Sequence, residues 1–154
     1  MIYEGSLSAD NKKICIVVSR FNSTITQNLV SAAKDFIIRS GGNEQSIDII
    51  YVPGAFEIGY AVKQACKKKV YDGIICLGCI IRGGTPHFEY LASQSTAAAA
   101  QLSLEFNIPI SNGILTVENM EQALERSGIK MGNKGWEAAS ALIELINVSR
   151  AFNA

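Results

Sequence analysis

The stretch CLGCIIRGGTPHFEY, residues 76–90, contains the only histidine of the chain. His87 follows a turn in which Gly83 and Gly84 let the backbone bend tightly and approach a ligand. Thr85 is a good N-cap and Pro86 a good first helical residue, so a helix is predicted to begin here. The free N–H groups and positive dipole end of such a helix suit a phosphate group. A plain strand-to-helix turn is the alternative.

The type and position of His87 suggest proton transfer. An imidazole gives and takes protons near neutral pH, as general acid–base catalysis requires. A structural or surface histidine is the competing interpretation. The place of His87 beside a candidate phosphate turn favours the catalytic interpretation.

Cys76 and Cys79 have a Cys-x-x-Cys spacing, which raises the question of a metal or redox site. The redox form of this motif begins a helix, whereas these residues lie in an apolar run typical of a strand. Residues three apart in a strand point to opposite faces, and a zinc site would lack a second pair of ligands. We therefore expect no metal. Cys15 and Cys66 are likewise predicted to be buried and reduced, as in a cytoplasmic protein.

These residues are positioned by alternating strands and helices. Apolar runs predict strands at 13–18, 47–52, 73–81 and 110–115, and helical spacing predicts helices at 23–39, 56–69, 85–106, 118–126 and 135–148. This order predicts a three-layer α/β/α sandwich around a four-stranded parallel, flavodoxin-like sheet. Residues 1–154 are predicted to form a single domain. Residues 1–9 fit neither layer and are predicted to be an arm that packs on a neighbouring subunit.

Open α/β sheets bind ligands at the carboxyl ends of their strands. The four predicted strands are followed by residues 19–22, 53–57, 82–87 and 116–119, which bring aromatic, amide, carboxylate and imidazole groups to one edge. Such a set suits a planar polar ligand. Arg126 and Lys134 flank a glycine-marked break between the last two helices. The local pattern alone indicates that Arg126 is a cation at the C-terminal end of a helix and that Lys134 is a solvated loop residue.

The charge balance limits the kinds of partner. Lys and Arg together number 14, as do Asp and Glu, so the formal net charge is zero. This argues against nucleic-acid binding driven by overall charge and leaves self-association open. The apolar runs are too short for a signal peptide or a membrane span, so we expect neither membrane nor nucleic-acid partners.

With these residues in hand, the chain resembles the lumazine synthase family over nearly its full length. The resemblance is carried by the motifs VSRFN (18–22), PGAFEI (53–58), LGCIIRGGTPHFEY (77–90), GILT (113–116) and GNKG (132–135). It implies condensation of 5-amino-6-(D-ribitylamino)uracil with 3,4-dihydroxy-2-butanone 4-phosphate to 6,7-dimethyl-8-ribityllumazine, the penultimate step of riboflavin biosynthesis. The resemblance implies no metal and no organic cofactor.

The resemblance also implies a role for each site residue. By this resemblance, Phe21 stacks on the pyrimidine, and the ribityl chain is held by Asn22, Ala55, Phe56 and Glu57. The polar edge of the pyrimidine contacts the backbone of Cys79, Ile80 and Ile81. The phosphate is bound by Gly84, Thr85 and Arg126, His87 transfers protons, and Lys134 lies near the substrates. Asn112 departs from the family, because many members carry an aromatic residue there that stacks on the pyrimidine.

Assembly follows from the same resemblance. The family builds its site between neighbouring subunits of a homopentamer, with the equivalents of Arg126 and Lys134 coming from the neighbour. Some members form a sixty-subunit icosahedral shell, which the length of residues 127–135 permits. Riboflavin synthase is a candidate partner. The alternatives are an archaeal-type riboflavin synthase, a flavin- or lumazine-binding module of flavodoxin or receiver type, and a shell protein without chemistry.

Overall fold

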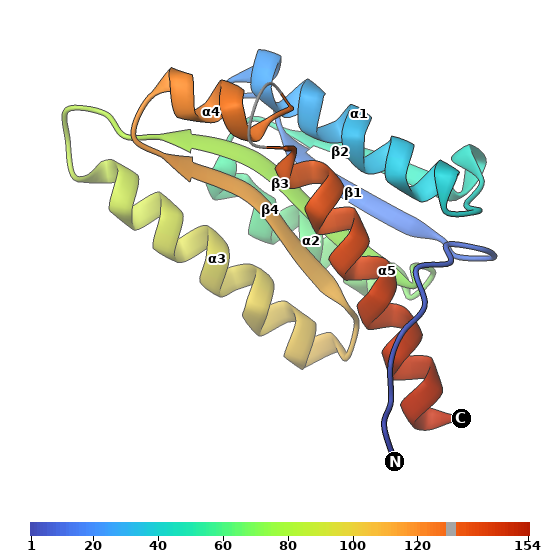
Figure 1. Ribbon diagram of the computed structural model, residues 1–154. Coiled ribbons are helices and arrows are strands. Elements are labelled where there is room, and N and C mark those ends of the chain that lie inside the picture. Colours follow the sequence, from blue (N-terminus) through green and yellow to red (C-terminus); the bar gives the residue numbers. More distant parts are fainter. Residues whose placement is uncertain (129–131) are drawn as a thin grey trace.

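Four parallel strands form one sheet in the computed structural model, which describes residues 1–128 and 132–154 (Figure 1). The strands are β1 (Ile14–Ser19), β2 (Ile47–Val52), β3 (Gly73–Ile81) and β4 (Ile110–Val117). Their spatial order is β2-β1-β3-β4. The chain therefore moves outward from β1 in both directions, and the order reverses between β1 and β3. The predicted parallel sheet of four strands is confirmed.

Helices cover both faces of this sheet. One face carries α1 (Ser23–Arg39), α4 (Met120–Arg126) and α5 (Lys134–Asn153), and the other carries α2 (Ile58–Lys68) and α3 (His87–Phe106). Two short 3-10 turns, Glu44–Ser46 and Ala55–Glu57, precede β2 and α2. The predicted three-layer sandwich is confirmed. No helix in the described ranges is long and apolar enough to cross a membrane.

Strand alternation divides the core into two halves. Ile16 packs with α1 and α5, whereas its neighbour Val17 packs with α2 and α3. Cys76 and Cys79 separate in the same way, one on each side of the sheet, so the strand interpretation of the Cys-x-x-Cys spacing is confirmed. All four cysteines are free and buried, as predicted.

The start of α5 lies unusually close to α1. The side chain of Asn133 caps α5 by accepting hydrogen bonds from the backbone N–H groups of Gly135 (2.7 Å) and Trp136 (3.2 Å), and it donates to the carbonyl of Asn28 in α1 (3.2 Å). A Cβ at Gly135 would lie 2.1 Å from the Leu29 carbonyl oxygen. A side chain at this position would therefore force α5, and with it Lys134, away from α1.

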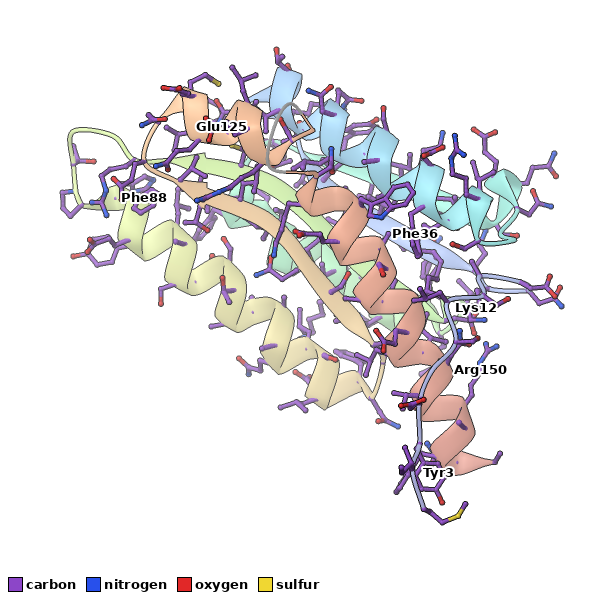
Figure 2. All side chains as sticks on the ribbon, viewed as in Figure 1. Tyr3, Lys12, Phe36, Phe88, Glu125 and Arg150 are labelled. Carbon is purple, nitrogen blue, oxygen red and sulfur yellow. The ribbon has the colours of Figure 1, made fainter. Side chains whose placement is uncertain are left out.

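The N-terminal arm, residues 1–9, runs along α5 of its own chain (Figure 2). The Tyr3 and Phe152 rings pack edge to face at 5.1 Å, and the Asn147 amide donates to the Ser6 carbonyl at 2.8 Å. These contacts accompany an α5 that continues to Asn153, beyond the end expected at residue 148. Contact of the arm with a neighbouring subunit stays a prediction.

Candidate active site

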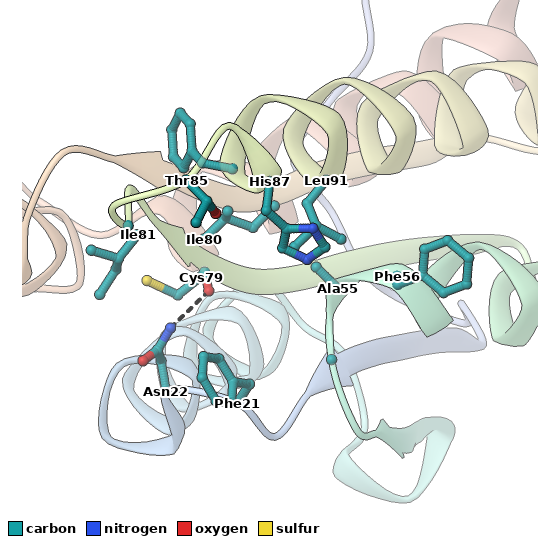
Figure 3. A pocket seen from close by; sticks show the side chains of 13 residues that line it. Phe21, Asn22, Ala55, Phe56, Cys79, Ile80, Ile81, Thr85, His87 and Leu91 are labelled. Carbon is teal, nitrogen blue, oxygen red and sulfur yellow. Dashed lines mark hydrogen bonds between the residues drawn. The ribbon is translucent and has the colours of Figure 1, made fainter.

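A cavity of about 390 Å³ opens at the carboxyl ends of β1 and β3, where the strand order reverses (Figure 3). Open α/β sheets place ligands at this point, because loops from neighbouring strands separate there. The cavity is lined by Phe21, Asn22, Gly54, Ala55, Phe56, Cys79, Ile80, Ile81, Gly83, Thr85, His87, Phe88 and Leu91. It therefore brings together nearly all the predicted residues that precede the last strand.

Asn22 ties the loop after β1 to the end of β3. Its backbone is left-handed (φ 62°), a conformation that asparagine tolerates better than most residues. In this conformation its side chain makes no capping bond to α1, and its amide donates to the Cys79 carbonyl at 3.0 Å. The Asn22 amide nitrogen and the Cys79 carbonyl are thus already engaged with each other at the cavity wall.

The aromatic residues of the site are held by backbone bonds and left exposed. The N–H groups of Arg20 and Phe21 donate to the carbonyls of Val52 (2.8 Å) and Pro53 (3.1 Å), so the loops after β1 and β2 are fixed to each other. The Phe21 side chain is 72% exposed and that of Phe56 is 65% exposed. Two exposed rings beside one cavity provide flat apolar surfaces on which a planar ligand can stack.

His87 is the first residue of α3, and its ring points from the helix start toward Ala55 (Figure 3). The prediction that Thr85 caps this helix is wrong. Pro86 occupies the cap position without a side-chain bond, and its carbonyl accepts the N–H of Glu89 at 3.1 Å. The helix begins at His87, two residues after the expected start at residue 85, because its first turn closes on Pro86, and Thr85 is left exposed beside the cavity.

The glycines of the turn before His87 are not required by packing within the chain. A Cβ added to Gly83 or Gly84 would meet no atom within 4 Å. Gly83 lines the cavity, and Gly84 lies next to it along the chain. Glycine at both positions leaves the backbone N–H groups of the turn open to a ligand.

Glu57, unlike Ala55 and Phe56, is not among the residues that line the cavity. One of its carboxylate oxygens accepts the Gly54 N–H at 3.0 Å and so stabilises the turn that presents Ala55 and Phe56. Sequence reasoning missed Phe88 and Leu91 as lining residues. Leu91 follows His87 by four residues and therefore shares its helix face, which is a signal that the sequence contains.

Asn112, Arg126 and Lys134 lie elsewhere, along the free edge of β4. Arg126 and Lys134 line a cavity of about 410 Å³ together with Thr116 and Glu137, and Asn112 lines an adjoining one that shares Lys134. Within the described residues, neither lining includes a residue of the His87 cavity. The chain therefore carries two separate groups of predicted site residues.

The side chain of Asn112 folds back on its own strand. Its oxygen accepts the N–H of Ile114 at 3.0 Å, a backbone group on the unpaired edge of β4. Asn112 is exposed, and its amide nitrogen has no side-chain hydrogen bond within the described residues. Arg126 is exposed and Lys134 half-buried, and neither makes a salt bridge within residues 1–128 and 132–154.

Burial raises the pKa of the Cys79 thiol to about 11, so this thiol is protonated and a poor nucleophile at neutral pH. Cys79 can therefore meet a ligand through its backbone, not as a thiolate. In the part of the chain that the structure describes, no three His, Cys, Asp or Glu side chains are grouped closely enough to hold a metal ion.

Comparison with known proteins adds an independent finding. Residues 11–150 match a family model described as 6,7-dimethyl-8-ribityllumazine synthase. A protein of that name from Campylobacter jejuni is 50% identical over 150 residues, which is 97% of either chain. Another from Nautilia profundicola is 51% identical over 146 residues, covering 94% of this chain and 95% of that one. A designed Rossmann-fold protein is similar in structure at 12% identity, with a TM-score of 0.40 over 72% of this chain and 90% of that one.

Proposed function

The chain belongs to the 6,7-dimethyl-8-ribityllumazine synthase family, and from this premise we propose which of its residues perform the chemistry. The enzyme condenses 5-amino-6-(D-ribitylamino)uracil with 3,4-dihydroxy-2-butanone 4-phosphate to 6,7-dimethyl-8-ribityllumazine. Relatives that share half of its residues are named lumazine synthases, which disfavours both the archaeal-type riboflavin synthase and the flavin-binding module.

The single observation that carries the site assignment is the position of His87 on the cavity with the two exposed rings. Phe21 stacks on the pyrimidine, and Asn22 and Phe56 hold the ribityl chain. The turn that contains Ala55 also contacts the ribityl chain, and Glu57 stabilises this turn by accepting the Gly54 N–H. The backbone of residues 79–81 provides hydrogen-bonding groups for the polar edge of the pyrimidine.

The phosphate binds at the turn before α3. Gly84 and Thr85 offer backbone N–H groups at the positive end of a helix of 20 residues, where an anion is stabilised. The Thr85 hydroxyl adds a donor at the cavity wall. This places the phosphate within a few residues of His87, which can then act on the part of the butanone that carries it.

The chemistry needs a group that moves protons. The amine of the pyrimidine adds to the ketone and loses water to form a Schiff base; the phosphate leaves as a proton is removed from the neighbouring carbon; and the ring closes with loss of a second water. His87 takes and returns protons in these steps, a contribution of about 10²–10⁴-fold. Holding both substrates together supplies more, up to about 7–11 kcal/mol. These steps transfer no electrons and so require no redox cofactor.

We infer that the complete site forms between two copies of the chain. The His87 cavity of one subunit would receive Arg126, Lys134 and Asn112 from the β4 edge of the next, so that the cations reach the phosphate. The amide nitrogen of Asn112 would donate to the ligand in place of an aromatic contact. Support comes from the separation of the two groups of residues within one chain.

The assembly that follows is a homopentamer of single-domain subunits in which the arm of residues 1–9 packs on a neighbour. A sixty-subunit shell is a further proposal from the length of residues 127–135, of which 129–131 lie outside the described residues. Riboflavin synthase, which would consume the product, is the proposed partner. A cytoplasmic location is supported by four cysteines that are free and buried.

The function is tested by mixing the purified protein with both substrates and, separately, with 6,7-dimethyl-8-ribityllumazine alone. Lumazine formation in the first mixture is the expected result. Riboflavin formation in the second would assign the chain to the competing synthase. Stoichiometric flavin that stays bound through purification, without turnover, would support the binding module.

A further inference from the structure

Arg82 connects three parts of the molecule that meet beside the cavity. Its backbone N–H donates to the carbonyl of Val117 at the end of β4, at 2.9 Å. Its side-chain Nε donates to a carboxylate oxygen of Glu118 at 2.7 Å, and its terminal nitrogen lies 3.6 Å from the carboxylate of Glu89 in the first turn of α3. The end of β3, the end of β4 and the start of α3 are thus joined through one side chain.

The same guanidinium also stacks on the neighbouring ring. Its central carbon lies 4.6 Å from the centre of the Phe88 ring. Phe88, labelled in Figure 2, is both a lining residue of the cavity and the neighbour of His87. Arginine combines stacking with fork-shaped hydrogen bonding, which lysine cannot do. One exposed ion pair contributes little to stability, but several contacts made by one planar group fix an orientation.

The segment that this arginine spans has few other attachments. Residues 83–86 are exposed, and a Cβ at Gly83 or Gly84 would contact nothing within 4 Å. The position of the first turn of α3 therefore depends on the apolar packing of Phe88 and Leu91 and on the contacts of Arg82.

We propose that Arg82 is a positioning residue, whose guanidinium holds the first turn of α3 against Glu118 and so fixes His87 and the phosphate turn. The inference rests on the proposed function, because it assigns Arg82 to the same site. Arg82 acts through Glu118, Glu89 and Phe88 and does not contact substrate. A displacement of about 1 Å in a reacting group can cost about 10²-fold, so a modest loosening is enough to lower turnover.

A double-mutant cycle tests the proposal. We expect Arg82→Met and Glu118→Gln each to lower kcat/KM about tenfold or more, and the double variant to lose no more than the larger single effect. Arg39→Met is the matched control, because Arg39 also pairs with a carboxylate, Asp35, at 2.9 Å, on the outside of α1. If Arg82 bound the phosphate itself, Glu118→Gln would free it and leave activity unchanged or improved. That outcome, additive losses, or no loss in either single variant would overturn the proposal.

The single histidine provides a second measurement that is independent of turnover. With ring-labelled histidine, the imidazole resonances belong to His87 alone, and we expect both single variants to shift them in the same direction while Arg39→Met does not. Unchanged resonances in both variants would contradict the positioning role of Arg82. A wild type that forms no lumazine contradicts the proposed function, whereas the resonances still decide whether Arg82 positions His87.

Discussion

At the scale of single residues, the proposed site combines one group that can transfer protons with several that bind and orient the substrates. His87 lines the cavity with Phe21, Phe56 and the backbone of β3, whereas the thiol of Cys79 is kept protonated by burial. Under the proposed function, the proton transfers therefore fall to one imidazole, in a chain that contains no other histidine.

Replacement of this imidazole gives the first prediction. We expect His87→Ala to slow lumazine formation more than about tenfold, because general acid–base catalysis contributes about 10²–10⁴-fold. The side chain is exposed, so assembly and thermal stability should be unchanged. Steady-state kinetics with both substrates, together with sedimentation, measures both effects. Turnover equal to that of the wild type would contradict the proton-transfer role.

At the scale of elements, much of the design could be predicted from sequence, because short apolar runs and helical spacing report local burial. The described strands and helices agree with the predicted ranges to within two residues at each end, except that α5 continues five residues further, to Asn153. The exact start of α3 was missed because both Thr85 and Pro86 suit the N-terminus of a helix. Only the hydrogen bond from the Glu89 N–H to the Pro86 carbonyl shows that Pro86 is the N-cap. The Asn22–Cys79 bond joins residues far apart in the chain, so local patterns could not predict it.

The close approach of α1 and α5 gives a prediction for Gly135. We expect Gly135→Ala to lower the free energy of unfolding by about 1–3 kcal/mol, since its Cβ would lie 2.1 Å from the Leu29 carbonyl oxygen. Denaturant unfolding measures the loss. Gly83→Ala is the control, because the same change there meets no atom within 4 Å and should leave stability unaltered. Equal stability of Gly135→Ala and the wild type would refute the close contact.

Asp48 in the edge strand β2 and its hydrogen-bond partner Tyr71 give a pH-dependent prediction. The Tyr71 hydroxyl donates a hydrogen bond of 2.6 Å to Asp48, and this bond, with a smaller contribution from the nearby Lys13, lowers the pKa of Asp48. Burial, together with the same hydrogen bond, raises the pKa of Tyr71. The ionised Asp48 therefore adds stability above its ordinary pKa of 3.8, and this is lost as pH falls through the lowered pKa. The neutral Tyr71 adds stability that is present below its ordinary pKa of 10.0 and is lost as pH rises beyond it.

We accordingly expect Tyr71→Phe to be less stable than the wild type by about 1 kcal/mol between about pH 5 and pH 9. The difference should shrink below about pH 4 and above about pH 10. Denaturant unfolding at a series of pH values checks this. A difference that stays constant across the whole range would show that the Tyr71–Asp48 bond does not account for it.

At the scale of the whole molecule, one chain presents two separate groups of candidate site residues. Under the proposed function, the cavity with His87 supplies the stacking surfaces and the phosphate turn, and the β4 edge supplies Arg126 and Lys134. A formal net charge of zero places no general repulsion between copies. Because symmetric assembly puts the same two surfaces against each other at every interface, each site would be completed by the next subunit.

Subunit complementation tests this central claim most directly. His87→Ala and Arg126→Ala chains, each of which we expect to be nearly inactive alone, are mixed in equal amounts, dissociated and reassembled. If the site is shared, a cavity from the Arg126→Ala chain meets an intact Arg126 from the His87→Ala chain in about one site in four, so about a quarter of wild-type activity should return. Activity no greater than the mean of the two separate variants would show that each chain holds a complete site, and would contradict the account.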